Sequence, residues 1–146
     1  MREDFRNVIQ TEFRQFEELF ASMMQSDNPL LGEVLDYVHS KRGKQLRPVM
    51  VLLSAGICRG ITTKTIETAT ALELMHTASL IHDDVLDEAD ERRGRPSVNA
   101  KWQSDTAIIL GDYILARTMA VGMASAQYDI ISYIGSAMAT LCEGEV

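Results

Sequence analysis

The spacing of the apolar residues, which follows the period of an α-helix along almost the whole chain, constrains the fold more than any other feature. In the first segment the apolar residues recur three and four positions apart: Phe5, Ile9, Phe13, Phe16, Phe20 and Met23. Such spacing gathers the apolar side chains into one stripe on one face of a helix. We find no segment in which apolar and polar residues alternate, as they do in a half-buried strand. The chain is therefore predicted to be all-α.

Interruptions of this pattern divide the 146 residues into about six predicted helices. Asp27-Asn28-Pro29 ends the first helix and begins a second, shorter one, because asparagine suits the N-cap and proline the first turn. Val49 to Cys58 is predicted to be a helix from its length and its helical neighbours, although its apolar run also allows a buried strand. Three further helices are predicted at Lys64 to Asp87, Asp105 to Gly122, and from Asp129 onward. The second of these is apolar on most sides and is expected to be buried.

The overall charge argues against nucleic acids as partners. The chain has a formal net charge of -7, whereas a nucleic-acid-binding surface needs a basic face. Cys58 and Cys142 are widely spaced and have apolar neighbours, so both are predicted to be core residues in a reducing compartment. The N-terminus lacks the apolar region of a signal peptide, and no apolar run approaches the ~18 residues that span a bilayer. We therefore expect a cytoplasmic protein without a transmembrane segment.

The stretch His82-Asp83-Asp84-Val85-Leu86-Asp87, at the end of the long predicted helix, carries the clearest chemical signal. On a helix Asp83 and Asp87 lie one turn apart on the same face, and Asp84 is three residues from Asp87. The three carboxylates are predicted to converge within a few ångströms, where their mutual repulsion favours bound cations. Oxygen ligands in this number suit Mg²⁺, which often bridges carboxylates and substrate phosphates. The alternative is a solvated acidic helix end, which the helix dipole disfavours.

Two basic motifs flank this helix, Gly43-Lys44-Gln45-Leu46-Arg47-Pro48 before it and Arg92-Arg93-Gly94 after it. Guanidinium groups bind phosphate oxygens in pairs, and a lysine adds a point charge. Either motif alone would most often be a solvated loop. The helix between them continues its aspartate face into a mostly apolar shaft through Leu72 and Met75. A charged end and an apolar shaft suit a ligand with an ionic head and a hydrocarbon tail, although the same two residues also fit an ordinary core.

The order of these motifs resembles that of the trans-isoprenyl diphosphate synthase family. The resemblance rests on Gly-Lys-x-x-Arg-Pro, then Asp-Asp-x-x-Asp on a helix, then Arg-Arg-Gly, and it runs from about Gly43 to the last residue. The segments 76–84, 92–99 and 111–113 are also similar to that family. The resemblance implies an isoprenoid-synthase-type helical bundle and a homodimer. Residues 1–146 would be the N-terminal part of a single polyprenyl synthase domain.

The resemblance also implies roles for particular residues. The aspartates Asp83, Asp84 and Asp87 would hold Mg²⁺ on the diphosphate of an allylic primer. Arg92 would contact the same diphosphate. The diphosphate of isopentenyl diphosphate would be held by four residues: Lys44, Arg47, His76 and Arg93. The implied reaction is a head-to-tail condensation, in which metal ions stabilise the departing pyrophosphate and the double bond of isopentenyl diphosphate attacks the allylic cation.

Small residues near the aspartates bear on the length of the product. Ser79 lies one turn before Asp83, near the start of the implied tunnel for the growing chain. According to the resemblance, Ala78 faces the same tunnel, where short-chain members of the family typically carry a bulky aromatic residue. The small side chains therefore predict a medium- or long-chain polyprenyl product, and Met75 further along is too flexible to be a firm floor. A simple crossing of two helices would also explain both small residues.

Two departures from the family pattern matter. Gln45 stands where the family often has another basic residue, although Lys44 and Arg47 are present. The family also needs a second aspartate-rich motif on a later helix, and this chain reaches Val146 without one. The chain is therefore expected to be truncated within its last helix and to be inactive by itself.

Other functions fit the residues less well. A His-Asp metal-dependent phosphohydrolase built on His82-Asp83 would need further histidines, and only His39 and His76 remain. A non-catalytic or regulatory subunit of a prenyl synthase would have no need for the aspartates and the basic motifs together. A terpene cyclase or head-to-head condensing enzyme of the same fold would lack the isopentenyl diphosphate site that Gly43 to Pro48 implies.

Overall fold

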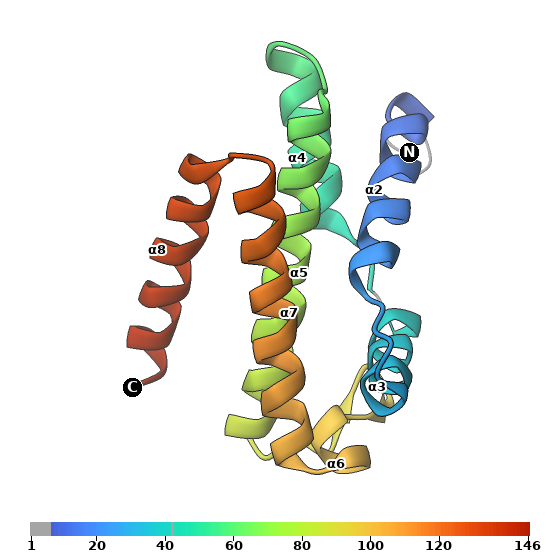
Figure 1. Ribbon diagram of the computed structural model, residues 1–146, viewed down its shortest axis with the longest axis vertical. Coiled ribbons are helices and arrows are strands. Elements are labelled where there is room, and N and C mark those ends of the chain that lie inside the picture. Colours follow the sequence, from blue (N-terminus) through green and yellow to red (C-terminus); the bar gives the residue numbers. More distant parts are fainter. Residues whose placement is uncertain (1–6, 42) are drawn as a thin grey trace.

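In the computed structural model, which describes residues 7–41 and 43–146, the chain is a bundle of α-helices (Figure 1). The described residues form seven helices: α2 (Gln10–Met23), α3 (Pro29–Ser40), α4 (Leu46–Cys58), α5 (Thr63–Leu86), α6 (Val98–Trp102), α7 (Ser104–Ala124) and α8 (Tyr128–Glu145). Two strands, β1 (Glu91–Arg92) and β2 (Arg95–Pro96), pair as an antiparallel hairpin. The all-α prediction is confirmed, whereas the hairpin and the short α6 were not predicted. Phe5, the first residue of the predicted apolar stripe, lies outside the described residues.

The helix boundaries follow from caps that the sequence encodes. Asn28 accepts a hydrogen bond from the Leu31 amide at 3.0 Å, and Pro29 opens α3, as predicted. At the start of α5 the Thr62 amide donates to Thr65 Oγ1 at 3.1 Å, which is half of a capping box. The apolar segment that allowed either a helix or a strand is helical and forms α4.

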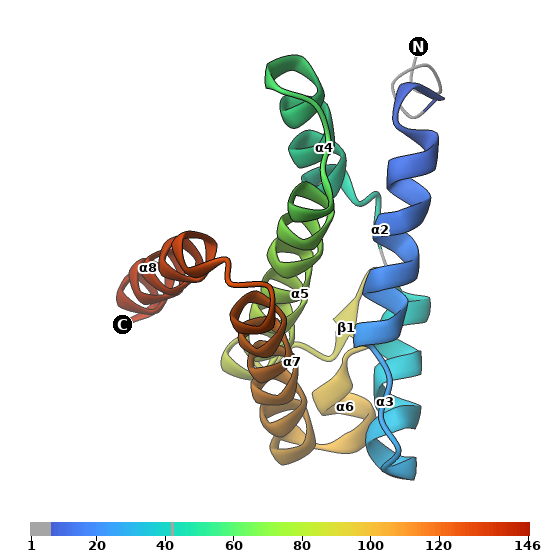
Figure 2. The ribbon, with the colours of Figure 1, turned by 45° about the horizontal axis from the view of Figure 1, so that its top comes forward.

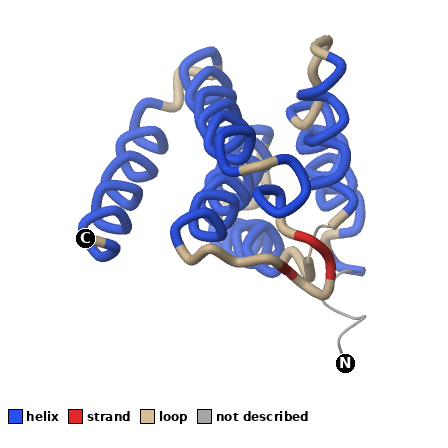
Figure 3. The backbone as a smooth tube through the Cα atoms, turned by 90° about the horizontal axis from the view of Figure 1, so that it is seen from below, coloured by secondary structure: helices blue, strands red, loops and turns tan. Residues whose placement is uncertain are grey.

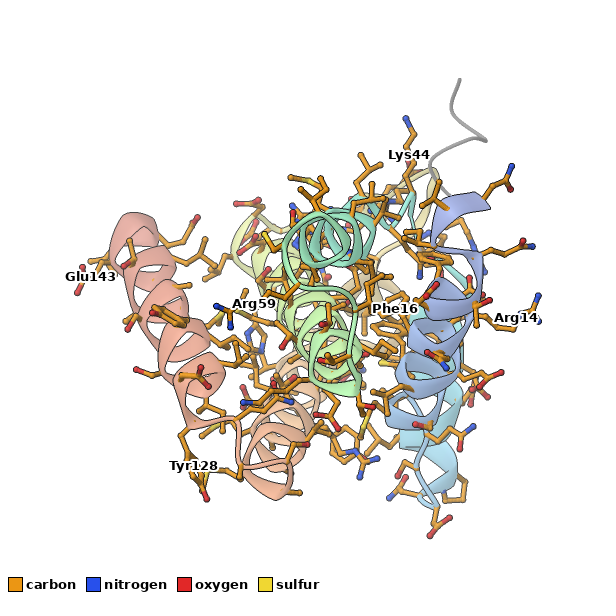
Figure 4. All side chains as sticks on the ribbon, turned by 90° about the horizontal axis from the view of Figure 1, so that it is seen from above. Arg14, Phe16, Lys44, Arg59, Tyr128 and Glu143 are labelled. Carbon is orange, nitrogen blue, oxygen red and sulfur yellow. The ribbon has the colours of Figure 1, made fainter. Side chains whose placement is uncertain are left out.

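The core lies where α5 meets α2, α4 and α7 (Figures 1 and 2). Phe16 points from α2 into this interior, and Leu74 of α5 and Leu110 of α7 are buried beside it (Figure 4). Each buried side chain of this size stabilises the fold by about 1.5–3 kcal/mol. The packing holds α5, the helix that carries the aspartates, between three other helices.

The connection from α5 to α6 is folded back by the hairpin (Figure 3). Its turn residues, Arg93 and Gly94, have positive φ angles of 54° and 73°, the geometry of a tight two-residue turn. Ser97 Oγ donates to the Ala89 carbonyl at 2.6 Å, and Asn99 Nδ2 donates to the same oxygen at 3.0 Å. These bonds tie the hairpin to the residues just after α5. The Arg-Arg-Gly motif therefore returns toward the helix instead of continuing away from it.

Burial of α7 is less complete than its apolar sequence predicted. One side packs on α5 and α6, but Ile109, Met119 and Met123 on the other side are 64%, 57% and 54% exposed. α8 covers only part of that surface, and none of its own residues is buried (Figure 2). By length and composition alone α7 is the one described helix apolar enough to cross a membrane. A core helix passes the same test, since apolar composition cannot distinguish the two.

The prediction that both cysteines lie in the core is wrong, because Cys58 and Cys142 are exposed. Cys58 is the last residue of α4, at the end of the bundle where the chain turns back into α5 (Figure 1). Cys142 lies on α8, which buries none of its side chains. Apolar sequence neighbours were a poor guide because neither helix is covered on all sides at these positions.

Candidate functional site

The C-terminal end of α5 holds the three aspartates in three different settings. Asp84 is 5% exposed and accepts two hydrogen bonds from Arg92, Nε to Oδ2 and Nη2 to Oδ1, each at 2.8 Å. Asp83 is half-buried, and Asp87 is exposed. The hydrogen bonds to Asp84 raise the pKa of the Arg92 guanidinium, and the charges of the three aspartates add to this effect, although burial opposes it.

The three carboxylates do not form a ready metal cluster. In the described part of the chain no group of three His, Cys, Asp or Glu side chains is placed to hold a metal ion, so the predicted convergence is not observed. The reason is that Asp84 is turned toward Arg92, which leaves Asp83 and Asp87 one helical turn apart. Their oxygens fit a hard cation such as Mg²⁺ when phosphate oxygens complete the coordination. The donor set therefore fits the predicted metal together with a phosphate-bearing substrate.

A cavity beside α5 is lined by the predicted basic residues, and we call it the basic pocket. Its lining comes from the loop before α4, from α4, from α5 and from the hairpin: Gly43, Lys44, Gln45, Leu46, Arg47, Glu73, His76 and Arg93. The structure thus brings together the four residues that the resemblance assigned to one diphosphate, with Lys44 at the outer edge of the molecule (Figure 4). Their role in binding that diphosphate stays a prediction.

Arg93 is fixed in the basic pocket by backbone groups of the loop before α4. Its Nη1 donates to the Lys41 carbonyl at 3.1 Å, and its guanidinium lies directly against the backbone of Gly43. A Cβ atom at Gly43 would overlap the guanidinium. The close approach of Arg93 therefore favours glycine here, which gives the first residue of the Gly-Lys-x-x-Arg-Pro motif a structural reason.

A second cavity links the basic pocket to the aspartate end of α5. His76 and Arg93 of the basic pocket line it, and so do Asp84 and Arg92. Its other lining residues include apolar side chains of α2, α3, α5 and α6. His76 and Arg93 of the basic pocket therefore adjoin Asp84 along one side of α5, whereas Asp83 lines a different cavity.

The basic pocket shifts the pKa of two of its members. Burial lowers the pKa of His76, and the positive charges of Arg47 and Arg93 lower it further, so the imidazole is neutral at neutral pH. Burial raises the pKa of Glu73, while Arg47 and Arg93 oppose that rise. Sequence reasoning missed Glu73. The signal that could have found it is an acid in the middle of the apolar run from Ala71 to Met75.

An apolar groove lies beside Asp83, between α5, α7 and α8. Ser79 and Asp83 line it together with mostly apolar residues that include Val85, Leu86, Ile108, Met138, Leu141 and Cys142. Ala78 does not line the groove, since it is completely buried in the core, and Met75 does not line it either. Roles in product length stay predictions for all three residues, but Ser79 is the one that borders the groove.

His82 joins α5 to α7. Its Nε2 lies 3.2 Å from the Ile108 carbonyl oxygen and 3.4 Å from a carboxylate oxygen of Asp112. A Cβ atom at Gly111 would overlap the imidazole, so only glycine lets α7 approach this closely. The histidine is thus engaged in helix packing, which disfavours a phosphohydrolase metal site built on it.

Comparison with known proteins assigns the chain to a family. Residues 28–146 match the family described as polyprenyl synthetase. The chain belongs to the polyprenyl synthetase family. An octaprenyl diphosphate synthase from Haemophilus influenzae is 32% identical over 144 residues, which are 99% of this chain and 44% of that protein. Component 2 of a heptaprenyl diphosphate synthase from Geobacillus stearothermophilus is 41% identical over 113 residues, 77% of this chain and 35% of that protein.

Solved structures of polyprenyl synthases share the fold. A polyprenyl synthase from Caulobacter crescentus, in complex with calcium and isoprenyl diphosphate, is 25% identical and has a TM-score of 0.92. The similarity covers 99% of this chain and 45% of that one. The isoprenoid-synthase-type fold predicted from the motifs is therefore confirmed. The chain spans less than half the length of these polyprenyl synthetase relatives.

Proposed function

We propose that the protein carrying this chain is a prenyltransferase, a trans-polyprenyl diphosphate synthase that condenses isopentenyl diphosphate with an allylic diphosphate. The observation that carries the proposal is the cavity along one side of α5 in which Asp84 and Arg92 adjoin His76 and Arg93 of the basic pocket. A head-to-tail condensation needs two diphosphate groups close together, and their charge requires dense positive charge nearby. Membership of the polyprenyl synthetase family supports the same reaction.

In this proposal the aspartate end of α5 receives the allylic primer. Mg²⁺, held by Asp83, Asp84 and Asp87 together with the primer, would supply Lewis acidity to the departing pyrophosphate. Arg92 already lies beside this end of α5 through its bonds to Asp84. Were Asp84 to bind Mg²⁺, the guanidinium of Arg92 would be free to bind phosphate oxygens in a bidentate manner.

The basic pocket receives isopentenyl diphosphate. Arg47 and Arg93 offer paired donors to its phosphate oxygens, and Lys44 adds a point charge. The neutral imidazole of His76 offers one further hydrogen bond. In the reaction the allylic carbon–oxygen bond breaks, a carbon–carbon bond forms with the double bond of the extender, and pyrophosphate and a proton leave. The residues contribute by positioning and charge stabilisation, and no nucleophilic side chain is required.

The apolar groove holds the growing hydrocarbon tail. It adjoins Asp83, near which the reacting carbon would lie, and its walls are mostly apolar side chains of three helices. The small Ser79 leaves the start of the groove open, which supports a medium- or long-chain product. The octaprenyl and heptaprenyl names of two relatives agree with that range.

We further propose a cytoplasmic homodimer. The exposed apolar side chains of α7 support self-association, because contiguous apolar surface is usually covered. A two-component synthase is the second candidate, since one relative is named component 2 of such an enzyme. The chain would then be the catalytic component, because it retains the aspartates and the basic pocket. Condensation by the purified protein alone favours the homodimer, and activity that requires a second protein favours the two-component enzyme.

The test is prenyl transfer by the complete native protein carrying Asp83→Asn or Asp84→Asn. Each substitution should lower kcat by about a hundredfold or more, because a carboxylate ligand is lost. Asp83→Asn is the cleaner variant, since Asp84→Asn also weakens the bonds to Arg92. The control is Asp90→Asn, which replaces an exposed acid three residues after Asp87 and should keep normal activity. Near-normal turnover of Asp83→Asn would contradict its assignment.

A further inference from the structure

Glu73 is an acid inside the basic pocket. It is 9% exposed, and it lines both the basic pocket and the cavity that leads to Asp84. Among the described residues that line the basic pocket, it is the one acid. A negative charge at this place opposes the binding of an anion. The proposed reaction gives Glu73 no role, so its presence requires a separate explanation.

The surroundings of Glu73 indicate which groups provide that explanation. Among the described residues its Oε2 has no hydrogen-bond partner. The opposite charges that act on its carboxylate are those of Arg47 and Arg93. Burial of an unpaired carboxylate is unfavourable, and the attraction of two guanidinium groups offsets part of that cost.

Arg47 and Arg93 come from different elements and meet at one pocket. Arg47 lies in the first turn of α4 and is exposed, whereas Arg93 belongs to the hairpin turn. Two like charges at the mouth of one pocket repel each other. The carboxylate of Glu73 on α5, which is packed between other helices, counters this repulsion because the charges of both arginines act on it.

We propose that Glu73 is a positioning residue, whose buried carboxylate holds Arg47 and Arg93 in the orientation that binds a diphosphate before the diphosphate arrives. It contacts no reacting atom and acts through the two arginines. Preorganisation of the donors then outweighs the repulsion between Glu73 and the anion. The identity of the diphosphate rests on the proposed function, whereas the positioning role requires only an anion in the basic pocket.

The two effects of Glu73 on a bound anion have opposite signs, so one substitution separates them. Glu73→Gln keeps the shape of the side chain and removes its charge. If the carboxylate positions the arginines, the affinity for inorganic pyrophosphate falls by about tenfold. If it is only a repulsive neighbour, the affinity rises. Calorimetric titration of the complete native protein without divalent metal measures this affinity, and unchanged or tighter binding overturns the proposal.

Two further variants control for folding. Glu67→Gln is the matched control, because it makes the same change on the same helix while its carboxylate bonds to Gln127 outside the basic pocket. Its affinity for pyrophosphate should stay within about twofold of wild type. Glu73→Asp keeps the charge but withdraws it from the arginines, so its affinity should lie between those of wild type and Glu73→Gln. Should Glu73→Gln fail to fold, Glu73→Asp decides alone, and wild-type or tighter binding overturns the proposal.

Steady-state kinetics distinguish this proposal from the proposed function. In an active prenyltransferase Glu73→Gln should raise the KM for isopentenyl diphosphate by about tenfold, with kcat and the KM for the allylic primer changed by less than about twofold. A protein without prenyl transfer in which Glu73→Gln still weakens pyrophosphate binding would refute the proposed function and support the positioning role. An active enzyme whose KM for isopentenyl diphosphate is unaltered by Glu73→Gln would support the proposed function and refute the positioning role.

Discussion

Gly43 and Arg93 illustrate at the residue scale how a single missing side chain determines the basic pocket. A Cβ atom at Gly43 would overlap the guanidinium of Arg93. The overlapping group is the far end of a flexible side chain. The strain is therefore relieved by moving Arg93, and the cost should appear in function more than in stability.

Gly43→Ala is accordingly expected to weaken binding by the basic pocket without unfolding the protein. The affinity for inorganic pyrophosphate should fall by about tenfold, since one bidentate charged contact is displaced, while the melting temperature changes little. Titration calorimetry and thermal melting measure the two quantities. Gly135→Ala on α8 is the control, because nothing lies within 4 Å of its added Cβ atom. A large loss of stability in Gly43→Ala with normal affinity would show that the loop, and not Arg93, needs the glycine.

At the scale of elements, local signals were predictable and long-range packing was not. The Asn28 cap and the helical character of Val49 to Cys58 follow from neighbouring residues, and both are confirmed. The exposed side of α7 depends on which helices pack against it, which apolar periodicity does not encode. In the candidate site, too, some features could be predicted from the sequence and others could not. The motif order predicted which cations meet, but not that Asp84 pairs with Arg92 or that Glu73 lies among the cations.

The apolar groove gives a prediction at this scale that separates two neighbouring residues of α5. Ser79 borders the groove, so Ser79→Phe should shorten the products by several isoprene units while the first condensations continue. Ala78 is completely buried, so Ala78→Phe should overpack the core and cost about 1–3 kcal/mol of stability. Chromatography of the prenyl products and denaturant unfolding of both variants measure these effects. An unchanged product distribution in Ser79→Phe would mean that the tail does not follow this groove.

At the scale of the whole molecule, the helices leave apolar surface uncovered. Ile109, Met119 and Met123 of α7 are more than half exposed, and α8 buries none of its residues. The core around α5 is nevertheless well packed, with Phe16, Leu74 and Leu110 buried in it. The bundle therefore has a packed core of its own, although part of its apolar surface stays uncovered. Among the described residues no three side chains are placed to hold a metal ion, so under the proposed function phosphate oxygens would complete the coordination by the aspartates.

The 146 residues, purified alone, are therefore expected to be helical, to self-associate and to lack condensation activity. Helicity follows from the capped helices and the packed core. Self-association follows from the exposed apolar face of α7, which a second copy can cover. Inactivity is expected because these 146 residues contain no second aspartate-rich motif, which the family resemblance requires for the remaining metal. Circular dichroism, light scattering and incorporation of labelled isopentenyl diphosphate test the three points. The same chain with Asp83→Asn controls for a contaminating host synthase, and condensation that this substitution abolishes would contradict the expected inactivity.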